Sequence, residues 1–115
     1  MGDCLFCSIA SGDVPADIVR QDEDFIAFRD IDPQAPHHVL VIPRRHLDAA
    51  RDARGEEGDR LLGRLVAFAT EVAGELGLDE KGYRIVTNTG PDGGQSVSHL
   101  HFHVLGGRVM RWPPG

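Results

Sequence analysis

The sequence predicts an α+β domain, in which one long helix covers one face of an antiparallel sheet of about five strands. Two observations support this fold class. The chain contains a short apolar segment, then strand-like segments, then one long segment of helical periodicity, and then further strand-like segments. Strands and helices that are grouped in this way are typical of α+β domains. The chain has 115 residues, enough for one core and too few for two, so residues 1–115 form a single domain.

The first elements follow from the apolar pattern and the turn residues. Residues 4–12 form a short helix or a compact loop that ends at Gly12. Residues 18–19 and residues 25–31 are predicted to be two strands joined by a turn at residues 21–24.

A loop and a central strand follow. Pro33 and Pro36 predict a loop, because proline lacks the backbone N–H and keeps its neighbour out of helical conformation. Residues 38–42 are rich in β-branched side chains and should form a central strand that stops at Pro43.

The second half contains the long helix. Residues 44–60 are charged and predict a surface connection with about one helical turn. Gly77 is placed as the C-terminal cap of a helix over residues 61–76. Residues 82–88 and residues 98–107 are the remaining predicted strands. The helix is predicted from apolar residues at three- and four-residue spacing: Leu61, Leu62, Leu65, Val66, Ala69, Val72, Ala73 and Leu76.

Charge and hydropathy exclude several classes of protein. The formal net charge is −6, which argues against a general DNA- or RNA-binding protein, because phosphate contacts require a basic surface. No apolar run approaches the roughly 20 residues that span a bilayer, so no membrane partner is expected. The N-terminus lacks the pattern of a signal peptide, which favours a cytoplasmic location and reduced cysteines.

The segment SHLHFHVLGG, residues 98–107, carries the strongest chemical signal. His99, His101 and His103 alternate with apolar residues, so a strand would place the imidazoles on one face and Leu100, Phe102 and Val104 against the helix. Imidazole, with a pKa near 6.5, can attack, donate a proton or accept one at neutral pH.

The preceding loop, residues 90–96, is rich in glycine and can direct backbone N–H groups at anionic oxygens. A nucleophile, an acid or base and oxyanion donors thus occur together within residues 90–103, which predicts chemistry on a phosphate ester. An alternative is that the alternating histidines bind a catalytic zinc ion.

The segment from His99 to Leu105 matches the signature of the histidine triad (HIT) family, and the chain resembles this family over nearly its whole length. The GGQSV segment and the WPPG terminus are similar to the Hint branch of purine nucleoside phosphoramidate hydrolases. The other matching segments are CLFC at residues 4–7, FRDI at residues 28–31 and DPQAP at residues 32–36, followed by His38.

The resemblance implies a role for each matching residue. His101 would attack the α-phosphorus and form a nucleotidyl-imidazole intermediate that water hydrolyses. His103 and Ser96 would contact the phosphate and help to protonate the leaving amine, and His38 would join the proton relay. Asp30 would accept hydrogen bonds from the ribose.

The resemblance also implies a nucleotide pocket. Its residues beyond those of the relay would be Asn88, Gln95 and Val97 near the phosphate and Leu5, Phe6, Ile9, Phe28 and Ile31 around the purine. The apolar residues of this set have an alternative role as ordinary core.

Cys4 and Cys7 form a C-x-x-C pair, which can hold half of a tetrahedral zinc site or support redox chemistry. The resemblance implies His46 and His99 as the other two ligands. Such a zinc would be structural, would orient His99, the first histidine of the catalytic triad, and would not be required for the chemistry. The alternative is a pair of free thiols that pack as small apolar groups.

The resemblance therefore predicts a hydrolase that cleaves the P–N bond of AMP or GMP conjugates. It also implies a two-fold homodimer with a joined sheet, with the long helix and the WPPG tail near the interface. Alternatives are a dinucleoside polyphosphate hydrolase or nucleotidyl transferase of the same family, and a nucleotide-binding module with little turnover.

Overall fold

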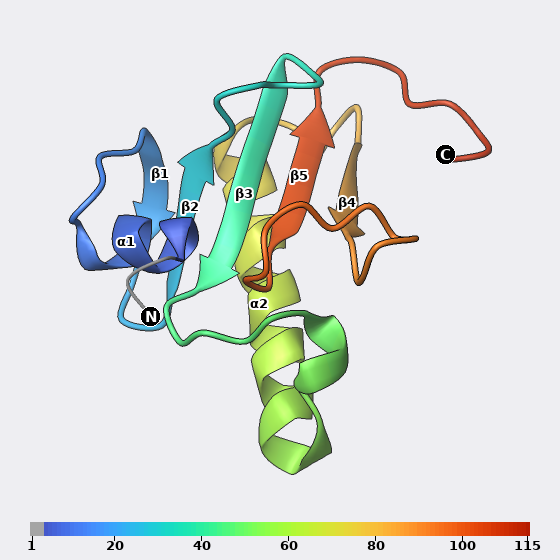
Figure 1. The fold of residues 1–115 in the computed structure, drawn as a ribbon. Helices are drawn as coiled ribbons and strands as arrows, with labels where there is room; N and C mark the ends of the chain where they lie inside the picture. The colour runs from blue at the N-terminus through green and yellow to red at the C-terminus, as the bar shows by residue number, and fades with distance from the viewer. Residues whose placement is uncertain (1–3) are drawn as a thin grey trace.

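The computed structural model describes residues 4–115 and contains a five-stranded antiparallel sheet with the strand order β1-β2-β3-β5-β4 (Figure 1). The predicted fold class is therefore confirmed. The elements are α1 (Leu5–Ser11), β1 (Ile18–Gln21), β2 (Phe25–Arg29), β3 (His37–Pro43), a short 3-10 helix (Ala50–Asp52), α2 (Gly55–Glu75), β4 (Tyr83–Thr87) and β5 (Phe102–Gly106).

The two faces of the sheet bury different clusters of side chains. On one face, Val39 and Val41 of β3 pack with Leu65, Phe68 and Val72 of α2, as alternation along a strand requires. This core also contains the three apolar residues of the histidine segment, Leu100, Phe102 and Val104. Their predicted contact with the helix is confirmed.

The other face carries α1. Leu40 and Ile42 of β3 point to this side and pack with Phe6 and Ile9 of α1 and with Phe28 of β2. The face that bears α1 is also the face on which the functional groups lie.

Helix α2 begins at Gly55, six residues before the predicted start at residue 61. The apolar periodicity identified only the part of the helix that faces the sheet, whereas its first turns are charged and exposed. Glu56 and Glu57 in the first turn interact favourably with the helix dipole. Gly58 permits close approach, because a Cβ there would overlap the backbone of Ala53. Gly77 follows the helix with φ +77°, as its predicted capping role requires.

Three strands are shorter than predicted, among them β4, which lacks one residue of the prediction at each end. β2 ends at Arg29 rather than at residue 31, because Asp30 turns the chain by accepting the N–H of Asp32 at 2.8 Å. β5 begins at Phe102, so His99 and His101 precede the strand instead of belonging to it.

Hydrogen bonds explain why residues 99–101 lie outside the strand that was predicted to contain them. The N–H of Leu100 donates to the carbonyl of Leu47 at 2.6 Å, outside the sheet, and the hydroxyl of Thr87 donates to the carbonyl of His101. Leu100, Phe102 and Val104 still face the helix although residues 99–101 are not part of the strand. The three histidines, however, are not evenly spaced on one strand. No helix within residues 4–115 combines the length and the apolar character needed to cross a membrane.

Candidate active site and metal centre

A cavity of about 640 Å³ lies on the α1 face of the sheet. It is lined by every residue predicted for the nucleotide site except Asn88 and Gln95. Most of the residues that line it are apolar, and most of these come from α1, from the connection between α1 and β1, and from β2. The polar side chains of the lining are those of Asp17, Arg29, Asp30, Ser96, His101 and His103. The predicted nucleotide residues therefore converge on one cavity.

Six further residues line this cavity and were not predicted. Leu40 could have been inferred, because it lies two residues from His38 on β3 and therefore on the same face. The others carry no sequence signal, because they belong to the connection between α1 and β1 or flank a predicted residue. They are Val14, Pro15, Ala16, Asp17 and Arg29.

Two predicted residues act on the loop rather than on the cavity. The side chain of Asn88 donates to the carbonyl of Gly93 at 2.7 Å. The side chain of Gln95 accepts the N–H of Gly90 at 2.9 Å and donates to the carbonyls of Asp48 and Val97. Both amides thus hold the glycine-rich loop and do not line the cavity, and their predicted place in the nucleotide site stays a prediction.

Hydrogen bonds set the protonation of His38 and His103. The N–H of Gln34 donates to Nδ1 of His38 at 3.0 Å, so neutral His38 carries its proton on Nε2. This Nε2–H lies 2.8 Å from Nδ1 of His103 and 3.4 Å from a carboxylate oxygen of Asp30. Since His103 accepts at Nδ1, its own proton lies on Nε2. His38 itself does not line the cavity, and its Nε2 contacts His103, which does.

His101 has the opposite arrangement. Its Nδ1 lies 2.7 Å from the carbonyl of His99, an acceptor only, so Nδ1 carries the proton. In the neutral ring of His101, the lone pair therefore lies on Nε2. The side chain is 4% exposed, and it lines the cavity beside His103, with the two ring centroids 5.1 Å apart. An unprotonated ring nitrogen next to a protonated one is suited to attack followed by proton donation.

Burial favours the neutral forms of His38 and His103. It lowers the pKa of His103 to about 4, and the nearby His101 and His38 add to the effect while Asp30 opposes it. Burial also lowers the pKa of His38, against the charges of Asp30 and Asp32.

This shift predicts a pH dependence of stability. Between pH 6.5 and about 4, the unfolded chain binds a proton at residue 103 that the folded protein does not bind. The free energy of unfolding should therefore decrease as the pH falls through this window and be unaffected by this group above it. In urea titrations, the free energy of unfolding of His103→Gln should fall less steeply than that of wild type between pH 6.5 and 4. The difference between the two slopes should correspond to at most one proton. Parallel curves for the two proteins would contradict the assignment.

A second cluster joins the start of α1 to the histidine segment. Nδ1 of His99 lies 3.3 Å from Sγ of Cys4, 3.6 Å from Sγ of Cys7 and 3.2 Å from Nδ1 of His46. The same nitrogen of His46 lies 3.3 Å from Sγ of Cys7. In a tetrahedral zinc site, ligand atoms lie about 3.3 Å apart for two nitrogens and about 3.6 Å apart for nitrogen and sulfur. The four residues fit that geometry.

The outer hydrogen bonds of the cluster also fit a metal. Nε2 of His99 donates to the carbonyl of Pro43 at 2.9 Å, and Nε2 of His46 donates to the carboxylate of Asp48 at 2.8 Å. Both imidazoles therefore direct an unprotonated Nδ1 at the thiols, the orientation found in metal-bound histidines. Burial, together with the neighbouring Cys4, raises the pKa of the Cys7 thiol, a cost that a divalent cation would offset. The sequence did not identify Asp48 as part of this cluster.

The three triad histidines do not form a metal site with one another. Within residues 4–115, the potential metal-binding groups are Cys4, Cys7, His46 and His99, and Asp30, His38 and His103. His99 belongs to the first group and its ring does not line the cavity, but its carbonyl contacts Nδ1 of His101. Its predicted catalytic role stays a prediction. The groups of the second set are occupied in the hydrogen bonds described above.

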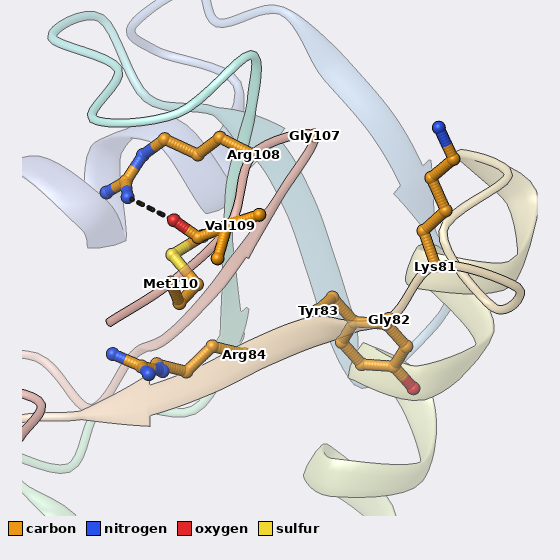
Figure 2. A pocket seen from close by; sticks show the side chains of 8 residues that line it. All are labelled: Lys81, Gly82, Tyr83, Arg84, Gly107, Arg108, Val109 and Met110. Atoms are coloured by element: carbon orange, nitrogen blue, oxygen red, sulfur yellow. Dashed lines mark hydrogen bonds between the residues drawn. The ribbon is translucent and has the colours of Figure 1, made fainter. Parts of the chain in front are cut away.

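A further cavity, of about 700 Å³, lies between the start of β4 and the segment after β5 (Figure 2). It contains none of the predicted site residues. Lys81, Arg84 and Arg108 line it, and none of the three forms an ion pair with an acidic residue of the described chain. Arg84 and Arg108 instead donate to backbone carbonyls, including those of Arg111 and Gln34.

Comparison with known proteins gives a consistent result. Residues 11–110 match the model of the HIT domain. An uncharacterised HIT-like protein of Synechococcus elongatus is 50% identical over 113 residues, which cover 98% of this chain and 97% of that protein. A 14 kDa zinc-binding protein of Zea mays is 47% identical over 112 residues, covering 96% of this chain and 87% of that protein.

Solved structures agree with this match. A HIT family hydrolase from Legionella pneumophila superimposes with a TM-score of 0.94 at 48% identity, covering 98% of this chain and 100% of that one. A histidine triad protein from Clostridium difficile gives a TM-score of 0.92 at 40% identity, with 96% of each chain covered.

Proposed function

This chain belongs to the HIT family, and from that membership we propose that it is a hydrolase that cleaves the P–N bond of purine nucleoside 5′-phosphoramidates. The observation that carries the proposal is the pair of imidazoles in the cavity. His101 presents an unprotonated Nε2, and His103 beside it carries a proton on Nε2. The chain is also similar to solved HIT family hydrolases.

The proposed reaction has two steps. Nε2 of His101 attacks the α-phosphorus, the P–N bond breaks, and the departing nitrogen takes a proton to leave as an amine. Water then attacks the phosphorus, the bond to His101 breaks, and the nucleoside monophosphate is released. The Nδ1–H bond to the carbonyl of His99 stabilises the positive charge that develops on the ring of His101.

The leaving group needs a proton donor, and His103 fits this role. Burial makes His103 neutral at pH 7, but a bound phosphoryl anion would favour its protonated form. Ser96 lines the same cavity and offers a hydroxyl to the phosphate oxygens. His38 and Asp30 hold the ring of His103 in position from the neighbouring strand.

The rest of the cavity suits a nucleoside. Asp30 can accept hydrogen bonds from ribose hydroxyls, since its side chain lines the cavity. Phe6, Phe28 and Ile9 are buried and provide an apolar wall for a planar base. Ile31 is fully exposed and Leu5 is 49% exposed, and a bound purine would cover both.

The direct test is steady-state hydrolysis of a fluorogenic adenosine 5′-phosphoramidate, with the guanosine analogue in parallel. We expect turnover of at least one of them, with release of AMP or GMP. Absence of turnover by folded protein would overturn the phosphoramidase proposal. A dinucleoside polyphosphate assay and equilibrium binding of AMP would then decide between the alternative hydrolase and a pure binding module.

We also propose that Cys4, Cys7, His46 and His99 hold a structural zinc ion. The ligand distances and the orientation of both imidazoles support this. The similarity to the 14 kDa zinc-binding protein of Zea mays is further support. Zinc would supply a rigid link between α1 and the sheet, and it takes no part in the two steps above.

The proposed homodimer has a suitable edge. β4 is a terminal strand of the sheet, so one side of its backbone is free to pair with a second copy. The cavity in Figure 2 lies at this edge, and the exposed Val109 is part of its lining. Sedimentation velocity should give twice the chain mass at micromolar concentration, and a monomer throughout would contradict the proposal.

A further inference from the structure

We infer that the Cys4–Cys7–His46–His99 cluster is a positioning device for the nucleotide cavity, so that metal binding and nucleotide binding are coupled. Two links between the cluster and the cavity support this inference. It rests on the proposed function in taking a purine nucleotide as the ligand.

The first link is α1. Cys4 caps this helix, and its Sγ accepts the N–H of Cys7 at 3.3 Å. Leu5 and Phe6, which lie between the two cysteines, are walls of the cavity. A helix of seven residues is too short to be stable alone, so its position depends on what it is attached to. A metal bound to both cysteines would attach this wall to His46 and His99.

The second link is the side chain of Phe6, which is 5% exposed. Its ring lies edge-on to His99, with centroids 6.0 Å apart, and edge-on to His101, at 5.1 Å. It also packs against Phe28 of β2, another residue that lines the cavity, with centroids 5.4 Å apart. Phe6 therefore touches a metal ligand, the nucleophile and the pocket wall at once.

The backbone adds to this connection. His99 directs its ring to the thiols and its carbonyl to Nδ1 of His101, 2.7 Å away. A metal bound to the ring of His99 would therefore also fix the position of its carbonyl. This carbonyl accepts the Nδ1–H of His101 and so leaves Nε2 of the neutral ring without a proton. Phe6 and His99 are positioning residues in this sense.

Coupling of two binding sites is reciprocal, which makes the inference testable from both sides. If zinc increases the affinity for AMP by a certain factor, AMP must increase the affinity for zinc by the same factor. We expect a factor of at least about fivefold, the lower end of typical coupling between sites.

The experiment measures AMP affinity by calorimetry in zinc-loaded and zinc-free protein, and the rate of zinc release to a chelator with and without AMP. Far-UV circular dichroism monitors folding. Zinc-loaded protein should bind AMP at least about fivefold more tightly, and AMP should slow zinc release. The release measurement uses folded, loaded protein, so it remains decisive if the zinc-free form unfolds.

Variants on α1 separate positioning from general stability. Phe6→Ala keeps all four ligands, and in this variant AMP should no longer slow zinc release, whereas Phe6→Leu should restore part of the effect. Ser8→Ala, on the same helix but outside both the cluster and the cavity, should behave as wild type.

The outcomes distinguish the two proposals. If zinc-loaded protein does not bind AMP, the proposed function fails and the coupling fails with it. If AMP binds with equal affinity to both forms and leaves zinc release unchanged, the coupling is wrong and the proposed function stands.

Discussion

His101→Ala should reduce the hydrolysis of adenosine 5′-phosphoramidate by at least about 10⁴-fold, because it removes the side chain that forms the covalent bond to phosphorus. His103 cannot replace it, since its Nδ1 accepts the proton of His38 and its Nε2 carries a proton. The variant should still bind zinc, because the side chain of His101 is not part of the four-residue cluster. Steady-state rates and metal content, measured on the same preparations, test both statements.

His37→Ala is the matched control for the loss of an imidazole. His37 lies beside His38 on β3, but it lines neither the cavity nor the metal cluster, and its Nδ1 has no hydrogen-bond partner. Its rate should stay within about twofold of wild type, as expected for a side chain outside the site. A His101→Ala protein that retains substantial turnover would exclude the nucleotidyl-imidazole mechanism. Loss of zinc from that variant would instead point to a metal site that includes His101.

The sheet and the core were predictable because they depend on local apolar patterns. The alternation of Val39 and Val41 with Leu40 and Ile42 separates the two buried faces of β3, and the structure places them accordingly. The start of α2 was not predictable in this way. Its first turns face solvent, where no apolar periodicity is required, and the closeness of Gly58 to Ala53 is visible only in three dimensions.

The site was predictable in its residue types and less so in its contacts. The triad pattern and the C-x-x-C pair identified the residues that the structure brings together at the cavity and the cluster. The pattern could not show that Leu100 bonds to Leu47 outside the sheet, before β5 begins. In this arrangement the ring of His99 lies beside the thiols. Nor could it show that Gln34 determines the tautomer of His38, since that depends on a backbone N–H from a loop.

Removal of zinc should lower the free energy of unfolding by about 4 kcal/mol, relative to protein with free zinc at 1,000 times its dissociation constant. The proposed metal would bind the folded chain through residues from three separate segments, so it would stabilise the native state by mass action. It would also place a cation beside a fully buried imidazole, His99, and the two thiols that this imidazole faces. Thermal unfolding with increasing zinc should show a rising midpoint.

The double variant Cys4→Ser with Cys7→Ser tests whether this stabilisation arises at the cluster. Its unfolding midpoint should be independent of zinc, because hydroxyl groups are poor zinc ligands, and it should lie near that of zinc-free wild type. Asp48→Asn keeps all four ligands and removes only the carboxylate that orients His46, so it should weaken zinc binding by about 10–100-fold without abolishing it. If zinc raised the midpoint of the double variant as much as that of wild type, the stabilising metal would have to bind elsewhere on the chain.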